Sequence, residues 1–231
     1  MADFVHLTNK TEYSLSEGAL PIARIAELCQ SFSMPAVGIS DNNNMFGALE
    51  FSEQIAKVGV QPILGCNIKI KTPKEYLHEN IEDNDLYFYL NIFSKNNEGY
   101  ENLLKCVSNA YTFNKGNAYV TVEDLIKFKD GLIILSGGNN SILTHSTGHM
   151  ITKQSQQFIS DFKKEFNDNF YIEIQRFGSV DYRLNEEAVL NLAYDHQIPL
   201  VATNDAYFEG PEHFEAHDAL MCIEKKLFVS Q

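Results

Sequence analysis

The chain has 231 residues, of which 44% are hydrophobic, so it is long enough to bury one sizeable core. Its 18 Lys and Arg against 31 Asp and Glu give a formal net charge of −13 at pH 7, which argues against a domain that grips nucleic acid by its phosphates, because such a domain needs a basic face. The sequence has no apolar run of the roughly 18 residues that a membrane span needs, no secretory pattern at its N-terminus and no paired spacing among its four cysteines, so we expect a cytoplasmic protein with reduced thiols and no membrane contact.

The first half of the chain alternates short apolar runs with helical stripes. Residues 4–7 form a short apolar run that predicts a strand. Residues 22–29 carry apolar side chains at i, i+3, i+4 and i+7, which is one face of a helix. The next expected elements are a strand at 36–39, a helix over 48–58 and a strand at 62–71.

The second half continues the alternation. It predicts strands at 86–93, 132–135, 170–174 and 199–203, and helices over 100–111, 152–166, 184–192 and 212–226. About seven strand-then-helix units favour a parallel sheet covered by helices. Because no linker interrupts the pattern, we expect a single α/β domain over residues 1–231, built as a closed or nearly closed barrel. Sites in such barrels gather where strands end and loops begin.

Polar residues follow several of these predicted strands. The candidate site residues are His6, Thr8, Glu17, Asp41, Asn42, Asn67, Gly138, Asp205 and Tyr207. A hydrolytic metal site needs several His and carboxylate ligands converging on each ion. Most of the candidates are poor ligands, so the residues alone favour a polar pocket held by hydrogen bonds over a multi-metal centre. Motifs for a nucleophilic serine, a phosphate-binding loop or a dinucleotide site are absent.

A set of motifs, taken in order, matches one family. The motifs lie at 4–7 with 13–19, at 34–41 with Asn44, Met45 and Gly47, and at 61–66, 95–103, 131–137, 201–205 and 216–220. On these segments the chain resembles the polymerase-and-histidinol-phosphatase (PHP) domains at the N-terminus of bacterial replicative DNA polymerase III alpha subunits. The resemblance covers nearly the whole chain and implies a distorted seven-stranded α/β barrel.

The resemblance also implies a site. Active members of the family carry a trinuclear metal centre and hydrolyse phosphoester bonds. Position by position, the remnants of that site are His6, Glu17, Asp41 and Asp205. The positions where the family's ligand is lost are Thr8, Asn42, Asn67, Tyr89, Gly138 and Tyr207. Neutral Asn and Thr cannot offset the charge of several divalent ions in a low-dielectric pocket, so we expect a vestigial site with no metal cluster, no cofactor and no catalytic residue.

The rest of the expected function follows from the same resemblance. The chain is expected to be the N-terminal PHP domain of a longer DNA polymerase, whose palm and fingers, with their Mg²⁺-dependent active site, lie beyond residue 231. Its expected partners are the rest of the alpha chain and the proofreading exonuclease subunit, while DNA is contacted mainly by other domains.

Several alternatives stay open at this stage. One is an active metal-dependent phosphoesterase or 3′–5′ exonuclease of the same fold. Another is a free-standing interaction module unrelated to replication. Within the site, His6, Glu17 and Asp205 could hold one weakly bound ion. Lys10, which falls where the family often has another His, could instead supply an internal cation.

Overall fold

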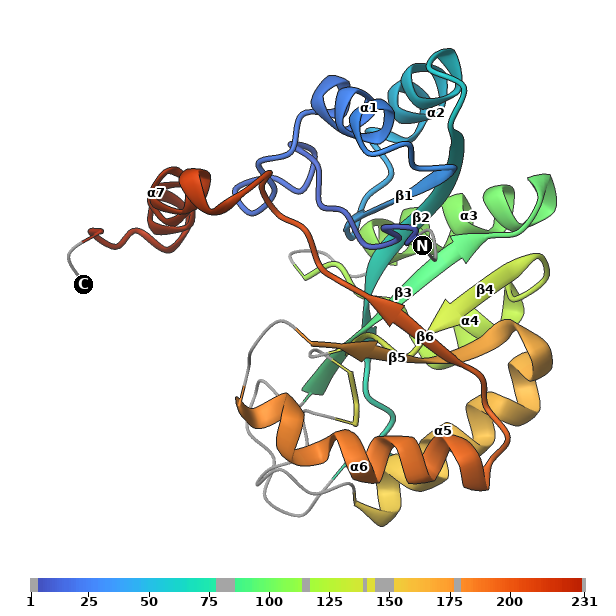
Figure 1. The fold of residues 1–231 in the computed structure, drawn as a ribbon. Helices are drawn as coiled ribbons and strands as arrows, with labels where there is room; N and C mark the ends of the chain where they lie inside the picture. The colour runs from blue at the N-terminus through green and yellow to red at the C-terminus, as the bar shows by residue number, and fades with distance from the viewer. Residues whose placement is uncertain are drawn as a thin grey trace. The chain divides into compact units, whose positions relative to one another are not determined.

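The computed structural model describes residues 4–77, 86–113, 117–138, 141–143, 152–176 and 180–229 (Figure 1). The chain forms two compact units. Unit 1 consists of Met1–Cys66 with Asn204–Gln231, and unit 2 consists of Asn67–Thr203. Among the described residues, none of the helices combines the length and the apolar character that crossing a membrane requires.

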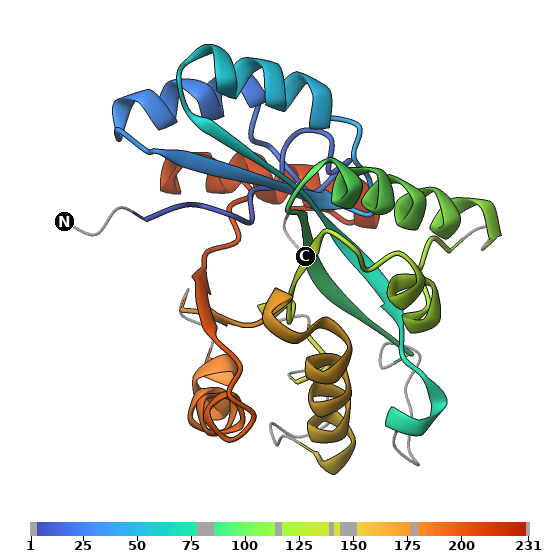
Figure 2. The same cartoon turned by 90° about the vertical axis from the view of Figure 1, so that its right-hand side faces the viewer.

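The N-terminal part of unit 1 contains two helices with a strand between them. The helix α1 (Ile22–Ser31) buries the apolar face that the sequence predicts, and α2 (Ala48–Lys57) buries Phe51 and Ile55. Between them runs β1 (Ala36–Asn42), which is buried over most of its length. Figures 1 and 2 show α1 and α2 side by side, and their buried faces share one core with β1.

The segment at 4–7, predicted as a strand, is not a strand in the structure. Its backbone follows β1 through single hydrogen bonds, such as that from Gly38 N to His6 O at 2.7 Å, and the next residues make only isolated bridges. The Asn9 side chain explains the break, because its Nδ2 donates to His6 O and Gly38 O, groups that a continuous ladder would use. The described residues therefore contain six strands where the sequence predicts about seven.

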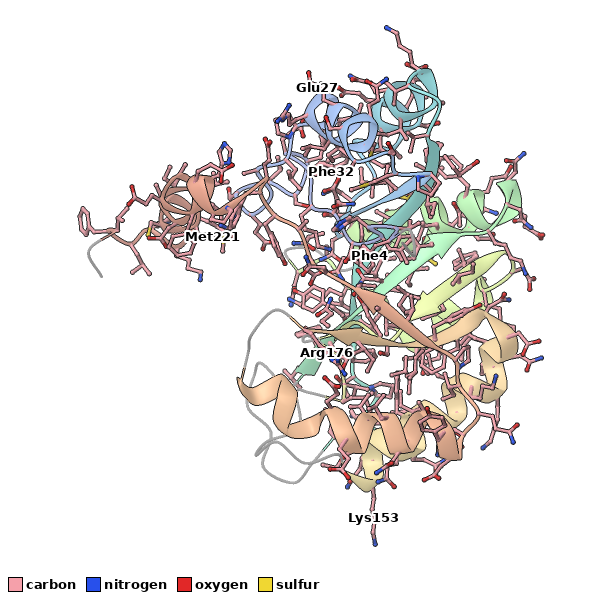
Figure 3. The ribbon with its side chains drawn as sticks, viewed as in Figure 1. Phe4, Glu27, Phe32, Lys153, Arg176 and Met221 are labelled. Carbon is pink, nitrogen blue, oxygen red and sulfur yellow. The ribbon has the colours of Figure 1, made fainter. Side chains whose placement is uncertain are left out.

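The C-terminal part of unit 1 ends in a helix without a fully buried residue. The 3₁₀ turn η5 (Pro211–His213) leads into α7 (Phe214–Lys225), close to the predicted helix over 212–226. Within the described chain, α7 buries none of its residues. Figure 3 shows its side chains, with Met221 labelled.

The strand β2 (Gln61–Lys71) runs from unit 1 into unit 2 and agrees with the strand predicted at 62–71. The other strands of unit 2 are β3 (Tyr87–Ser94), β4 (Leu132–Leu135), β5 (Phe170–Gln175) and β6 (Leu200–Thr203). The strands hydrogen-bond in sequence order from β1 to β6. The mixed α/β fold agrees with the prediction.

The expectation of a parallel sheet is wrong for the pair of β3 and β4. β4 pairs with β5 and β5 with β6 in parallel, but β3 pairs with β4 antiparallel, with Ser94 opposite Leu132. Two helices lie between these strands, α3 (Asn97–Phe113) and the unpredicted α4 (Val122–Lys127). Helix α3 leads the chain away from the end of β3, and the stretch that contains α4 leads it back. β4 therefore starts beside the end of β3.

A glycine pair marks this return. A Cβ on Gly99, at the start of α3, would lie 1.9 Å from the backbone oxygen of Gly131, which immediately precedes β4. Gly131 itself has a φ of +73°, a backbone conformation that favours glycine. The same carbonyl accepts a hydrogen bond from Lys95 N at 2.8 Å. The chain can approach itself this closely only because neither Gly99 nor Gly131 carries a side chain.

The core of unit 2 is aromatic. Helix α5 (Lys153–Phe166) starts with a capping box between Thr152 and Ser155. Its buried Phe158 packs edge-to-face on Phe88 of β3, with ring centroids 5.0 Å apart. The remaining elements of the unit are α6 (Val180–Asp195) and the 3₁₀ turns η1 (Lys74–Tyr76) and η4 (Asn167–Asn169).

Candidate functional site

The two units divide the predicted site residues between them. Unit 1 contains His6, Thr8, Glu17, Asp41, Asn42, Asp205 and Tyr207. Unit 2 contains Asn67, Tyr89 and Gly138. Each group has its own hydrogen-bonding network.

Asp41 lies near the end of β1 and is 1% exposed. Its Oδ1 accepts from Thr11 N at 2.7 Å and from Ser14 Oγ at 2.6 Å, and its Oδ2 accepts from Thr11 Oγ1 at 2.7 Å. Three short bonds to a buried carboxylate are the strong, charge-assisted kind. The Asp41 carboxylate therefore fixes the loop that contains Thr11 and Ser14 to the end of β1.

Glu17 is the second carboxylate of unit 1. Burial raises its pKa, while a hydrogen bond from Asn42 Nδ2 and the positive charges of Lys10 and Lys225 act in the opposite direction. The backbone oxygen of Glu17 lies 2.7 Å from His217 Nε2, which ties α7 to this loop. Asn42, one of the predicted lost ligand positions, thus serves as a neutral partner for Glu17.

Three buried polar atoms of unit 1 have no hydrogen-bond partner among the described residues. They are His6 Nδ1, Thr8 Oγ1 and Asp205 Oδ1. The segments that carry them are neighbours at one point, since Ala206 N donates to Thr8 O at 3.1 Å. Burial lowers the pKa of His6, which favours its neutral form. Tyr207 packs its ring near His217, with centroids 5.8 Å apart.

Lys10 belongs to the same unit. Its side chain is 1% exposed, its Nζ donates to the backbone oxygen of Ser40, and the same atom lies 3.4 Å from Ser40 Oγ. Its backbone N–H donates to Ala206 O at 2.9 Å, next to Asp205 in the chain. The structure therefore keeps this ammonium group away from solvent, near enough to Glu17 for its charge to lower the pKa of that carboxyl.

Unit 2 has a buried carboxylate that the sequence analysis missed. Glu173, in β5, is 1% exposed. It accepts from Asn91 Nδ2 at 3.0 and 3.2 Å, from Gly137 N at 3.1 Å, from Gln175 Nε2 at 3.2 Å and from Thr203 Oγ1. All of these donors are neutral. The sequence did carry a signal for this buried polar group, namely a Glu two residues before a Gln inside an otherwise apolar strand.

The predicted site residues of unit 2 join or border this network. Asn67 Nδ2 donates to Asn91 Oδ1 at 2.8 Å. Gly138 has a φ of +53°, and a Cβ on it would lie 2.2 Å from Oε1 of Gln175. A Cβ on Gly137 would lie 1.8 Å from the backbone oxygen of Tyr89. The Gln175 side chain thus fills the space that a larger residue at 138 would need.

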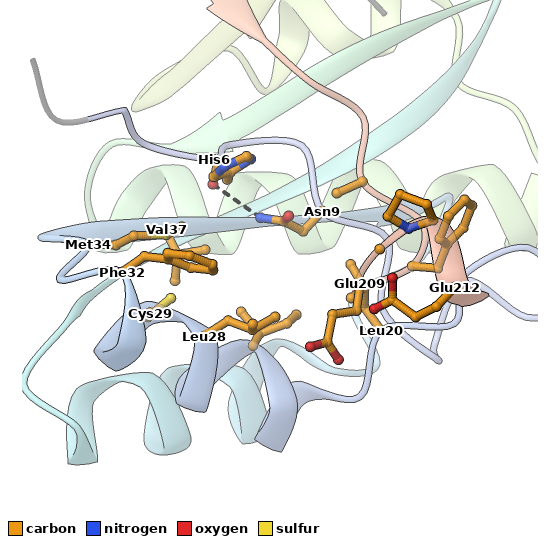
Figure 4. A pocket seen from close by; sticks show the side chains of 15 residues that line it. His6, Asn9, Leu20, Leu28, Cys29, Phe32, Met34, Val37, Glu209 and Glu212 are labelled. Atoms are coloured by element: carbon orange, nitrogen blue, oxygen red, sulfur yellow. Dashed lines mark hydrogen bonds between the residues drawn. The ribbon is translucent and has the colours of Figure 1, made fainter. Parts of the chain in front are cut away.

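Unit 1 also has a mostly apolar cavity of about 380 Å³ (Figure 4). Its wall comes from α1 and the turn after it, including Leu28, Cys29 and Phe32. Its polar margin comes from His6 and Asn9 on one side, and from Glu209 and Glu212 on the other. Such a recess fits an apolar side chain or a small apolar molecule better than a charged substrate.

Comparison with known proteins decides the family. Residues 6–177 match the family described as PHP domain. The chain belongs to the PHP domain family. This PHP domain is 37% identical over 234 residues to the DNA polymerase III subunit alpha of Caulobacter vibrioides, an alignment that covers 99% of this chain and 20% of the relative.

Other relatives give the same pattern. The DNA polymerase III subunit alpha of Haemophilus influenzae is 32% identical, covering 95% of this chain and 18% of its own length. The Aquifex aeolicus subunit is 30% identical, covering 97% and 20%. The PHP domain therefore spans about one fifth of the length of the curated relatives it matches. The resemblance seen in the sequence is confirmed.

Two solved structures share the fold at low sequence identity. One is a Bifidobacterium adolescentis protein described as a candidate metal-dependent phosphoesterase, with a TM-score of 0.59, 12% identity, and coverage of 91% of this chain and 90% of that one. The other is an amidohydrolase of Chromobacterium violaceum, with a TM-score of 0.58, 10% identity and coverage of 94% and 96%. These likenesses establish the fold alone.

Because the resemblance seen in the sequence implies a metal centre in active members of the family, the donors of this PHP domain can be tested against one. Among the described residues, no three His, Cys, Asp or Glu side chains gather as a group that could hold an ion. Asp41 already has three of its roughly four lone-pair sites engaged by donors, and Gly138 offers no ligand. Lys10 adds a positive charge to the same unit. These residues do not fit a multi-metal centre, and the predicted absence of bound metal stays a prediction.

Proposed function

We propose that this PHP domain is a segment of a DNA polymerase III alpha chain that works in the cytoplasm. The observation that carries the proposal is 30–37% identity over almost the whole domain to alpha subunits about five times longer. In this proposal the complete chain synthesises DNA on a template, and its Mg²⁺-dependent active site lies outside the 231 residues. DNA is contacted mainly by those other parts, which agrees with the net charge of −13.

Within that chain the domain acts as a structural and docking element, without hydrolytic activity of its own. The buried Lys10 and the engaged carboxylate of Asp41 support this view, because a hydrolytic metal centre needs acidic ligands that are available to the ions. The alternative is an active phosphoesterase or 3′–5′ exonuclease. The Nδ1 of His6 and the Oδ1 of Asp205, which find no hydrogen-bond partner in the described part of the chain, would favour it.

Exposed apolar side chains at the end of unit 1 support a role in docking. Phe214 is 60% exposed, Ile223 74% and Phe228 74%. Large apolar groups gathered at a surface are typical of interaction sites. We assign this surface to contact with the rest of the alpha chain, and the cavity beside α1 to an apolar side chain of the proofreading exonuclease subunit.

Activity assays separate the two candidate functions. The domain is incubated with a model phosphoester and with single-stranded DNA, with and without Mn²⁺, and we expect no turnover in either case. Metal-dependent turnover that is abolished by His6→Ala and by Asp205→Ala would establish the active enzyme instead.

Docking is tested in the complete alpha subunit that contains this domain. We expect the cognate exonuclease to co-purify with the complete chain, and to bind less tightly when Leu28→Asp puts a charge into the cavity wall. A matched Leu49→Asp change, on the exposed face of α2, should leave binding unchanged. An intact alpha subunit that does not bind the exonuclease would refute the docking role.

A further inference from the structure

Two lysines and two tyrosines of unit 2 lie against one another. Lys69 Nζ lies 4.4 Å from the centroid of the Tyr87 ring, and Lys71 Nζ lies 5.3 Å from that of Tyr119. The two rings are neighbours, with centroids 5.4 Å apart. Asn117 joins them, because its Oδ1 accepts from Lys69 Nζ at 3.0 Å and its Nδ2 donates to Tyr87 Oη at 3.0 Å. We call these five residues the lysine–tyrosine cluster.

Three neighbouring backbone segments hold this cluster together. The residue after β2, Thr72, donates its N–H to Leu86 O, just before β3, at 2.9 Å. Lys71 N donates to Val120 O, and Val120 N donates to Lys69 O, both at 2.9 Å. Successive N–H groups of a strand point to opposite sides, so β3 and the segment at 117–120 flank the end of β2. The lysines thus lie on the middle segment, and one tyrosine reaches them from each side.

The alternation of the strands turns the cluster away from the aromatic core of unit 2. The residues on either side of Lys69 in β2 are at most 1% exposed. In β3, Phe88 follows the tyrosine of the cluster and packs on Phe158 of α5. By contrast, Lys71 and Asn117 are exposed, and the other members of the cluster are half-buried. The cluster therefore faces solvent, with its rings and lysine side chains held in place by one another.

The local charge of this surface is opposite in sign to that of the whole chain. The described segments 67–77, 86–94 and 117–120 contain three lysines and one glutamate, whereas the chain has a net charge of −13. Lysine ammonium groups bind phosphates, and aromatic rings beside them stack with exposed bases. Proteins use this combination to bind single-stranded nucleic acid without sequence preference. A duplex keeps its bases paired and stacked inside, so it would engage the lysines alone.

We propose that the lysine–tyrosine cluster is a binding site for single-stranded DNA, in which Lys69 and Lys71 contact phosphates and the rings of Tyr87 and Tyr119 contact bases. The choice of DNA rests on the proposed function, because the complete polymerase chain would work on a single-stranded template. The cluster spans only a few nucleotides in a domain whose overall charge repels DNA. Binding should therefore be weak and should fall steeply as the salt concentration rises.

The test measures binding of a fluorescein-labelled oligothymidylate of about 12 nucleotides to the 231-residue chain, by fluorescence anisotropy over a series of salt concentrations. A lysine variant combines Lys69→Gln with Lys71→Gln, and a tyrosine variant combines Tyr87→Leu with Tyr119→Leu. Lys127→Gln is the matched control, since the Nζ of that lysine also lies over an aromatic ring, 5.3 Å from its centroid, but outside the cluster.

We expect the lysine variant to bind at least about tenfold more weakly than the unaltered chain. The slope of log K against log salt should become smaller by about 1.4, the value for two phosphate contacts on a single strand. The tyrosine variant should bind at least about fivefold more weakly, because it loses base stacking. An abasic oligomer of the same length should bind to the unaltered chain with a similar loss. Lys127→Gln should bind like the unaltered chain.

The inference is overturned if the unaltered chain does not bind the oligothymidylate at low salt, or if either cluster variant binds it as tightly as Lys127→Gln does. Equal binding of the abasic oligomer and the oligothymidylate would also overturn it. Should the tyrosine variant fail to fold, as circular dichroism would show, the lysine variant and the abasic oligomer decide, because neither replaces a ring. The assay contains no exonuclease and no nucleoside triphosphate, so a failure of docking or of DNA synthesis would remain distinguishable.

Discussion

The Asp41 carboxylate offers the sharpest test of how unit 1 is held together. In Asp41→Ala the backbone N–H of Thr11 loses its acceptor and cannot turn toward another one, which costs about 1–3 kcal/mol for a buried donor. The hydroxyls of Thr11 and Ser14 can rotate, so each loses only the net value of a hydrogen bond, about 1 kcal/mol. We therefore expect the free energy of unfolding to fall by about 3–5 kcal/mol.

Asp41→Asn should lose less, about 1–2 kcal/mol, because one oxygen can still accept from Thr11 N and Ser14 Oγ. The assay is urea unfolding followed by circular dichroism and by fluorescence, with hydrogen exchange of the Thr11 amide as a local readout. Asp168→Ala is the matched control, since that side chain is 94% exposed and its ion pair with Lys163 spans 3.9 Å. A loss below about 1 kcal/mol in Asp41→Ala, with the Thr11 amide still protected, would refute the reasoning.

Three further predictions concern other positions. Burial lowers the pKa of His6, so the unfolded chain binds a proton on this side chain more readily than the folded chain does. Stability that is complete above the unfolded pKa of about 6.5 should therefore fall as the pH drops toward the folded pKa. His6→Gln should flatten this part of the plot of unfolding free energy against pH, whereas His196→Gln should not. In urea unfolding, Gly99→Ala should lower the free energy of unfolding by about 2–3 kcal/mol, because the new Cβ clashes with the backbone of Gly131. Gly59 has a positive φ but open space around it, so Gly59→Ala should lose about 1 kcal/mol. Equal losses in the two variants would contradict the close approach of Gly99 to Gly131. Burial raises the pKa of Cys106 to about 12, so iodoacetamide at pH 8 should modify the partly exposed Cys222 first and Cys106 last, as peptide mass spectrometry would show, and early modification of Cys106 would contradict its burial.

The helices and strands that the sequence predicts well are those whose burial follows from local spacing, as one apolar stripe on a helix or as a continuous apolar run in a strand. The stripe on α1 and the apolar runs of β1 and β4 each follow from local spacing, and the structure buries them accordingly. The antiparallel pairing of β3 with β4 could not be read locally, because it depends on α4 and on the close contact of Gly99 with Gly131. The segment at 4–7 is not a strand because the Asn9 side chain donates to backbone oxygens that a strand there would use. The apolar pattern of residues 4–7 does not indicate this.

The candidate site shows a similar division. The sequence identified Asp41, Glu17 and Asn42 as strand-end polar residues, and the structure connects each of them to a hydrogen-bonding partner in unit 1. It did not identify Glu173 or Asn91, because both lie inside strands that were taken to be apolar. Periodicity says which positions are buried, but it does not say which buried polar groups satisfy one another across strands.

Both units of this PHP domain hold a buried carboxylate with neutral donors. In unit 2, Glu173 accepts from amide, hydroxyl and backbone donors. In unit 1, Asp41 accepts from the backbone N–H of Thr11 and from the hydroxyls of Thr11 and Ser14. Donors that the fold orients in advance strengthen one another in a poorly hydrated interior, and a buried network is costly to break because each group that remains loses its partner. We therefore expect exchange of Asn91 for Ala in unit 2 to lower the free energy of unfolding measured in urea, because Glu173 then loses one of its donors.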